Sequence, residues 1–121
     1  TCLVGSEMCI RDRLLEFSGR RHSVMTCVCF GETDPQSDTE VIMMFDLVRT
    51  EIQFANLTAN QCAKYWETNE PKDKAGAYGI QGYGGLFVES LEGSYSNVVG
   101  LPVVETCKIF KEKNIGYWLN Q

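Results

Sequence analysis

The chain has 121 residues, of which 44% are hydrophobic and 22% are charged, and this balance is ordinary for one globular domain of modest size. The formal net charge of −5 and the lack of a basic stripe argue against a protein that binds a nucleic-acid polymer. The sequence contains no apolar run near the ~20 residues that a membrane-spanning helix requires, so an integral membrane protein is not expected.

The six cysteines are expected to be reduced thiols. Cys27, Cys29, Cys62 and Cys107 each lie in an apolar run, where a free cysteine behaves as a small buried hydrophobic residue. Cys27 and Cys29 have strand spacing, which differs from the C-x-x-C of a zinc or redox site. Since the sequence holds a single histidine, no metal site is assigned within this chain, and a reducing, cytoplasmic location fits best.

The segment 1–13, TCLVGSEMCIRDR, is expected to be foreign to the gene. Residues 3–12 resemble a translated transposase adapter from a sequencing library, so we expect a cloning or assembly scar with no structure of its own. Residues 14–121 would then be the native part, and the gene would extend further upstream. Residues 14–18 have the pattern of a last helical turn that stops at Gly19.

Two extended regions follow this helix end. Residues 21–30 place apolar side chains on both faces, which is typical of a strand covered on both sides, and residues 31–39 form a polar loop. Residues 40–54 predict one long strand or two consecutive ones, antiparallel to the first. Asp46 lies among apolar residues of this region. A catalytic carboxylate is one interpretation, and a strand-edge residue facing water is the favoured one.

Residues 58–68 predict a helix, because Thr58 and Gln61 form a T-x-x-Q capping box at its start. Its apolar face fits core packing better than base stacking and consists of Cys62, Tyr65 and Trp66.

The stretch 73–106 is dense in glycine and carries almost no net charge, and the rest of the chain looks like its support. Glycine lets the backbone approach a ligand or turn tightly, and the spacing fits neither a Walker loop nor a Rossmann fingerprint. Gln81 stands among flexible residues, and its amide could read the edge of a nucleobase. For Ser94 and Asn97, turn and capping chemistry competes evenly with ligand contacts.

Residues 86–91 predict a short strand. Pro102 is expected in the first turn of a last helix, whose core-facing residues would be Val103, Val104, Cys107 and Phe110. The order of the elements predicts an α/β layered domain with a mixed, twisted sheet flanked by helices, incomplete at the N-terminus.

Two motifs, DKAGAYGIQG (residues 73–82) and GSYSNVVGLP (residues 93–102), together resemble the Maf family of nucleotide pyrophosphatases. The segment SGRRHSVMTCVCF (residues 18–30) and Glu70-Pro71 also match that family, and the resemblance covers nearly all of residues 14–115. It implies a cytoplasmic α/β enzyme that hydrolyses nucleoside triphosphates to the monophosphate and pyrophosphate. A divalent metal, magnesium or manganese, is the implied cofactor, and a homodimer is common in the family.

The I-Q-G of the first motif resembles the branch that acts on dTTP, UTP and modified pyrimidine triphosphates. In that branch the glutamine selects the substrate, a role that the resemblance carries to Gln81. Lys74 matches the lysine of the same motif and takes a weaker phosphate-binding or structural role.

Three elements of the family are missing from this sequence: a Ser-x-x-Arg-Arg-type loop, an acidic residue in a G-A-D-T-like strand, and a lysine in a G-K-P turn. A triphosphate demands cationic donors and metal-holding carboxylates around the reacting phosphorus. The catalytic residues and most metal ligands are therefore expected outside this chain, which would be an inactive piece of the enzyme. A nucleotide-binding or regulatory half-domain without catalysis, or a part of a fusion protein, are the alternatives.

Overall fold

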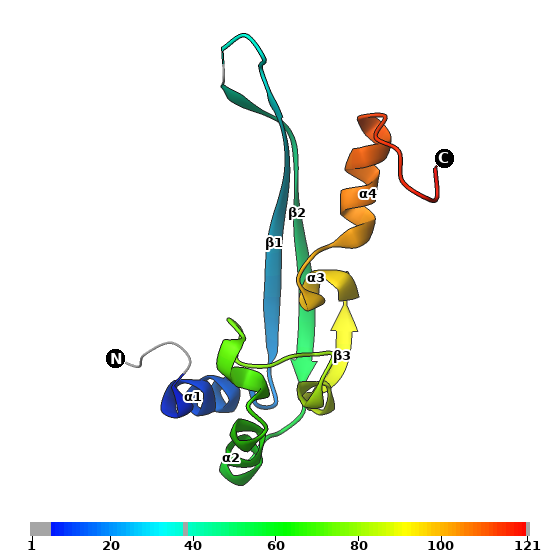
Figure 1. Cartoon of the computed structure of the whole chain (residues 1–121). Helices are drawn as coiled ribbons and strands as arrows, with labels where there is room; N and C mark the ends of the chain where they lie inside the picture. The colour runs from blue at the N-terminus through cyan, green and yellow to red at the C-terminus, as the bar shows by residue number, and fades with distance from the viewer. Residues whose placement is uncertain (1–5, 38, 121) are drawn as a thin grey trace. The chain divides into compact units, whose positions relative to one another are not determined.

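The computed structural model describes residues 6–37 and 39–120. In chain order its elements are α1 (Glu7–Phe17), β1 (Arg21–Thr33), β2 (Glu40–Phe54), α2 (Ala59–Glu67), the 3-10 helices η1 (Glu70–Asp73) and η2 (Tyr83–Phe87), β3 (Val88–Glu92), α3 (Tyr95–Val99) and α4 (Val103–Glu112) (Figure 1). Helices and a sheet together confirm the α/β class. Within these residues, no helix has the length and apolar character needed to cross a membrane.

The sheet differs from the mixed sheet that was predicted. Its three strands lie in the order β1-β2-β3 and are antiparallel. β2 and β3 pair with Glu51 opposite Glu92, and the register shifts between Gln53 and Phe54. A short loop joins β1 to β2, whereas a parallel pair needs a crossover of a dozen or more residues. This connection therefore dictates an antiparallel pair.

The chain divides into two compact units. Unit 1 comprises residues 1–23 and 51–93, and unit 2 comprises residues 24–50 and 94–121.

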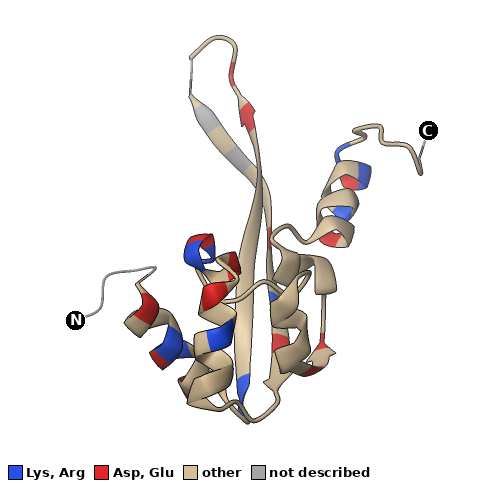
Figure 2. Cartoon of the chain, turned by 60° about the horizontal axis from the view of Figure 1, so that its bottom comes forward, with Lys and Arg blue, Asp and Glu red and all other residues tan. Residues whose placement is uncertain are grey.

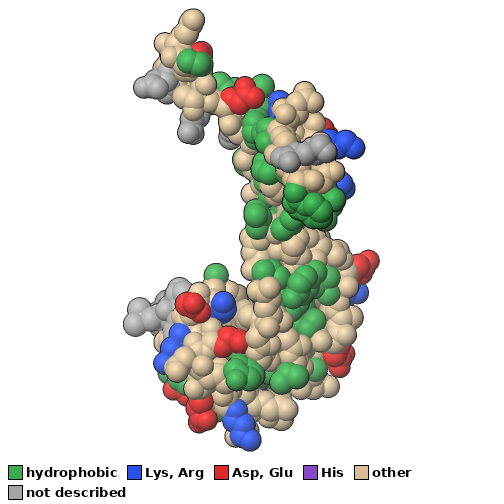
Figure 3. Space-filling view, turned by 45° about the vertical axis from the view of Figure 1, so that its right-hand side comes forward, with side chains coloured by type: hydrophobic (Ala, Val, Ile, Leu, Met, Phe, Trp, Pro, Cys, Tyr) green, Lys and Arg blue, Asp and Glu red, His purple; other side chains and the backbone are tan. Residues whose placement is uncertain are grey.

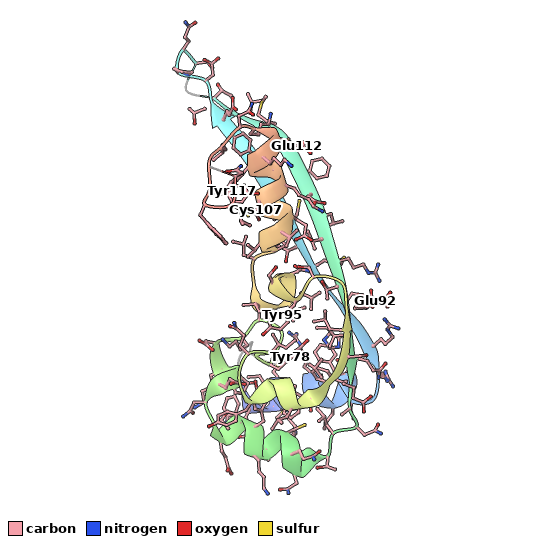
Figure 4. All side chains as sticks on the ribbon, turned by 90° about the vertical axis from the view of Figure 1, so that its right-hand side faces the viewer. Tyr78, Glu92, Tyr95, Cys107, Glu112 and Tyr117 are labelled. Atoms are coloured by element: carbon pink, nitrogen blue, oxygen red, sulfur yellow. The ribbon has the colours of Figure 1, made fainter. Side chains whose placement is uncertain are left out.

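Unit 1 has an aromatic core around Phe54, which is fully buried. The centroid of its ring lies 4.8 Å from that of Tyr78, 4.9 Å from that of His22 and 5.7 Å from that of Phe17, and all three pairs meet edge to face. Other side chains of unit 1 surround Tyr78 (Figure 4). Such aromatic pairs add about 0.5–1.5 kcal/mol each beyond the burial of apolar area. This cluster joins the end of α1, both long strands and the glycine-rich stretch.

Helix α1 corrects the expectation that residues 1–13 have no structure of their own. Ser6 caps the helix, since its side chain accepts a hydrogen bond of 3.3 Å from a backbone N–H of the first turn. Ile10 and Leu14 are buried, and α1 packs against α2 (Figure 1). Their i, i+4 spacing places both on one face, which gives the segment a reason to be helical. Its foreign origin stays a prediction, and residues 1–5 lie outside the described part.

Helix α2 confirms the predicted helix and its capping box. The Thr58 hydroxyl accepts a hydrogen bond from the Gln61 N–H at 3.2 Å, and the Gln61 side-chain oxygen accepts one from the Thr58 N–H at 2.9 Å. Cys62 and Tyr65 are buried, as core packing requires. The short strand that was expected from residue 86 begins at Val88 instead, because η2 precedes it.

Unit 2 is tied together by Asn97, whose side chain is fully buried. Its Nδ2 lies 3.0 Å from the Val24 carbonyl oxygen, 3.3 Å from the Val48 carbonyl oxygen and 3.0 Å from Thr50 Oγ1. Ser94 caps α3 by accepting a hydrogen bond of 3.1 Å from the Asn97 N–H. Turn and capping chemistry therefore accounts for both residues, and Asn97 also joins α3 to the two long strands.

Two predictions of burial in unit 2 are wrong. Cys27 and Cys29 are exposed on one face of β1, with their sulfurs 3.7 Å apart, and this face of β1 is not covered. On α4, Val103 and Val104 are exposed and Ile109 is buried instead. Figure 3 shows hydrophobic side chains at the surface, and Figure 2 shows a long stretch without charged residues in β1. The five cysteines of the described segments are all free thiols, as expected.

Candidate functional site

The candidate site is the glycine-rich loop of residues 74–87 in unit 1, which folds as consecutive tight turns. The Gly82 N–H donates to the Gly79 carbonyl at 3.2 Å, and the Gly85 N–H donates to the Gly82 carbonyl at 3.1 Å. Ala77 is buried and adopts a φ of 73°, a left-handed conformation that a small residue tolerates better than a large one. The loop is therefore a compact structure, although it is irregular.

One carboxylate holds this loop. Glu70 Oε1 accepts a hydrogen bond from the Tyr83 N–H at 2.9 Å, and its Oε2 accepts one from the Gly84 N–H at 2.9 Å. The Tyr65 hydroxyl also donates to Oε2 and in turn accepts a hydrogen bond of 3.0 Å from the Gly79 N–H. These four bonds, which we name the Glu70 clamp, join α2 and η1 to both ends of the turn between Gly79 and Gly84.

The protonation states of the Glu70 clamp suit its hydrogen bonds. Burial raises the pKa of the Glu70 carboxyl, but the hydrogen bonds from Tyr65, Gly84 and Tyr83 outweigh it, and the pKa ends below its usual value. Burial, together with the bond to Glu70, raises the pKa of the Tyr65 phenol. A charged carboxylate therefore faces neutral donors, which makes its hydrogen bonds stronger than those between neutral groups.

Glycine is required at two places in the clamp for packing reasons. A Cβ at Gly82 would overlap Glu70 Oε1. A Cβ at Gly84 would lie 2.7 Å from the Gly79 carbonyl oxygen and 2.8 Å from the Tyr65 hydroxyl. By contrast, a Cβ at Gly76 would meet nothing within 4 Å. Packing therefore requires glycine at Gly82 and Gly84 but does not require it at Gly76.

The structure places both predicted substrate-binding residues on this loop. Gln81 is exposed on the turn that the Glu70 clamp closes. Lys74 is exposed as well, and its Cε would lie 3.2 Å from a Cβ at Gly79, so its side chain runs along the turn. The charge of Lys74 also lowers the pKa of Glu70. Asp46 is half-buried on β2 and belongs to unit 2, and nothing in the geometry assigns it a catalytic role.

A groove of about 310 Å³ opens in unit 1 beside the loop. Tyr65 and Tyr83 belong both to this groove and to the Glu70 clamp, and the other lining residues are Ala55, Asn56, Leu57, Gln61, Lys64, Thr68, Leu86 and Phe87. Sequence reasoning missed the groove, because its walls come from the end of β2, from α2 and from η2. Glu70 was likewise noted only as part of the Glu70-Pro71 match. That match was the one available signal for the clamp.

The fit of a divalent metal to this chain is poor. Over residues 6–37 and 39–120, no group of three or more His, Cys, Asp or Glu side chains is arranged to hold a metal ion. The carboxylate of the loop, Glu70, is occupied by three hydrogen bonds. These residues do not form a metal site by themselves, so we derive no step through a metal.

His22 gives unit 1 a pH-dependent contribution to stability. Its Nε2 lies 2.7 Å from the Tyr78 hydroxyl, and its ring stacks on Phe17 at a centroid distance of 4.1 Å. Burial lowers the pKa of His22 below the usual 6.5, although the charge of Glu51 partly opposes this. Because the folded state resists protonation, the stabilisation is complete above pH 6.5 and is lost as pH falls through 6.5 towards the folded pKa.

We therefore expect the urea concentration at the unfolding midpoint of the wild type to decrease as the pH is lowered from about 7 to about 5. In His22→Phe this decrease should be smaller. The phenyl ring keeps the aromatic packing and cannot be protonated. Identical pH slopes for the two proteins would contradict the assignment to His22.

Comparison with known proteins extends these observations. The family model described as Maf-like protein matches residues 5–113. A protein of Pseudoalteromonas atlantica named dTTP/UTP pyrophosphatase is 43% identical over 107 residues, which cover 88% of this chain and 52% of that protein. Proteins of the same name from Vibrio vulnificus (46% over 99 residues) and a Shewanella species (47% over 102 residues) cover 82% and 84% of this chain. The chain spans about half the length of the curated relatives it matches.

Proposed function

Since the chain belongs to the Maf family, as its motifs predicted, we propose that it is part of a nucleoside triphosphate pyrophosphatase for dTTP, UTP and related pyrimidine triphosphates. The products would be the nucleoside monophosphate and pyrophosphate. This chain would supply the part that reads the base. The observation that carries the proposal is the exposed amide of Gln81 on a turn that the Glu70 clamp holds in place.

The chemistry of an amide suits a pyrimidine base. A glutamine side chain offers two N–H donors and one carbonyl acceptor, and uracil and thymine present carbonyl oxygens beside a ring N–H. A held turn also loses less conformational freedom on binding than a mobile one. Lys74 brings a positive charge to the same loop, and we propose a secondary role for it, either at the phosphates or in holding the loop.

Family membership also supports a divalent metal, magnesium or manganese, as the cofactor of the whole enzyme. When bound, such a metal neutralises charge on the phosphoryl oxygens. Residues 6–37 and 39–120 hold no group of side chains arranged as its site, so we place most of its ligands, and the acidic residue that activates water, in the part of the family's sequence that this chain does not match. We expect no turnover by this chain alone and a homodimer of the whole enzyme.

Replacing Gln81 with alanine tests the base-reading role. A protein in which this chain is completed by the part of the family's sequence that it does not match should release pyrophosphate from dTTP and UTP in preference to GTP, with magnesium present. In Gln81→Ala the ratio of the rates with UTP and with GTP should fall about tenfold, because the enzyme loses one hydrogen bond that distinguishes the two bases.

Gln36→Ala is the matched control, since Gln36 is also exposed but lies in the loop between β1 and β2. An unchanged preference in Gln81→Ala would refute the role of that residue. Binding of nucleotides without pyrophosphate release would favour a half-domain that binds but does not catalyse.

A further inference from the structure

We propose that Glu70 is the positioning residue of the base-reading turn, and that its carboxylate sets the selectivity for pyrimidine nucleotides through Gln81. This inference rests on the proposed function and deepens it, because it names the residue that holds the reader in place. Glu70 touches no reacting atom in this account and acts only through the turn.

The Glu70 clamp fixes the backbone on both sides of Gln81. On one side the Gly79 N–H donates to the Tyr65 hydroxyl, which donates to Glu70. On the other side the N–H groups of Tyr83 and the next residue donate directly to the carboxylate at 2.9 Å. Only three residues lie between these anchors, and Gln81 is the middle one. Its backbone therefore has little freedom, while its side chain stays exposed.

A carboxylate is the group that fits this position. Three donors converge on it, namely two backbone N–H groups and one phenol, and an ionised carboxylate accepts at both oxygens. A glutamine at the same position would accept at one oxygen only, and its NH2 group would face a donor. Gly82 leaves the space that the carboxylate needs, since a side chain there would overlap it, and Gly84 leaves space for the Gly79 backbone and the Tyr65 hydroxyl.

Glu70→Gln therefore changes the hydrogen bonding of the clamp without changing its size. Without the clamp, the turn samples more conformations, and Gln81 meets the base in the right orientation less often. The binding affinity therefore decreases for nucleotides whose base contacts Gln81. A role in folding alone would lower the fraction of active protein but would leave the ratio of two affinities unchanged.

The test is isothermal titration calorimetry of the full chain with UTP and with GTP, which measures the dissociation constant of each nucleotide. We expect the wild type to bind UTP more tightly than GTP, and Glu70→Gln to lose about tenfold in the ratio of the two dissociation constants. The control Glu67→Gln makes the same charge change at an exposed position of α2 and should keep the ratio. Combining Glu70→Gln with Gln81→Ala should lower the ratio no further than Gln81→Ala alone, because both act on one contact.

The outcomes separate the two proposals. Wild-type protein that binds UTP no better than GTP would overturn the base-reading function, and the role of Glu70 with it. A selective wild type whose ratio falls in Gln81→Ala but is kept in Glu70→Gln would overturn the role of Glu70 alone. If Glu70→Gln fails to fold, Tyr65→Phe replaces it, since this change removes one donor to the carboxylate and frees the Gly79 N–H. An unchanged ratio in Tyr65→Phe would then be the contradicting result.

Discussion

Asn97→Ala is expected to lower the free energy of unfolding of unit 2 by about 2–3 kcal/mol. The Asn97 side chain is fully buried, and its Nδ2 reaches the carbonyl oxygens of Val24 and Val48 as well as Thr50 Oγ1. Alanine removes this donor from both carbonyl oxygens, and the bond that Val48 loses is fully buried, whereas Thr50 Oγ1 keeps the Ser94 N–H at 3.1 Å. Urea unfolding followed by circular dichroism measures the loss, and amide exchange in α3 locates it.

Two further variants sharpen this prediction. Asn97→Asp keeps the size of the side chain but replaces its donors with a carboxylate that faces carbonyl oxygens, so it should destabilise unit 2 at least as much at neutral pH. Val99→Ala changes an exposed residue of the same short helix and should cost much less. Equal losses for Val99→Ala and Asn97→Ala would show that the buried amide has no special role.

Gly84→Ala is expected to lower the stability of unit 1 by about 1–3 kcal/mol. The added methyl group would meet the Gly79 carbonyl oxygen at 2.7 Å and the Tyr65 hydroxyl at 2.8 Å, and the first of these is backbone. The loop must therefore shift, which also breaks the bond from the Gly84 N–H to Glu70. Thermal unfolding and amide exchange of the loop measure the effect.

Gly76→Ala is the matched control for this change. It adds the same methyl group to the same loop at a position where nothing lies within 4 Å. We expect a change in stability of no more than a few tenths of a kcal/mol, since alanine also restricts the unfolded chain. A loss in Gly76→Ala as large as that in Gly84→Ala would refute the packing argument.

The parts of the fold that were predicted correctly depend on neighbours in the sequence. The capping box of Thr58 and Gln61 involves residues three apart, and it is formed as expected. The long strand of residues 40–54 and the stop at Gly19, whose φ is 66°, have the same local origin. Local patterns of this kind can be read from one sequence, because their energies come from the segment itself.

The errors arise where distant segments decide the outcome. Residues 1–13 were expected to have no structure because residues 3–12 resemble an adapter, and nothing near Ile10 in the sequence shows that this segment will pack against α2. The start of β3 was misplaced for a similar reason, because η2 is held by the Glu70 clamp from thirteen residues away. Exposed faces on β1 and α4 were predicted to be buried, since the pattern of a strand or helix does not state which segments cover it.

The candidate site divides in the same way. Gln81 and Lys74 were selected by their place in a motif, and both lie on the exposed loop. The Glu70 clamp and the groove beside it could not be predicted from local patterns, because five backbone and side-chain groups converge there from α2, η1 and the turns. The sequence also does not show which glycines are needed for packing, because this depends on where the Glu70 carboxylate and the neighbouring turns lie.

Base reading by this chain is tested most directly by a nuclear magnetic resonance titration of the isotope-labelled chain with UTP and, separately, with GTP. We expect UTP to shift the side-chain amide of Gln81 and the backbone amides from Gly79 to Gly84 at lower concentration than GTP does. We also expect Gln81→Ala to remove this difference. Equal shifts with both nucleotides, or shifts confined to residues outside this turn, would contradict the claim that this chain reads a pyrimidine base.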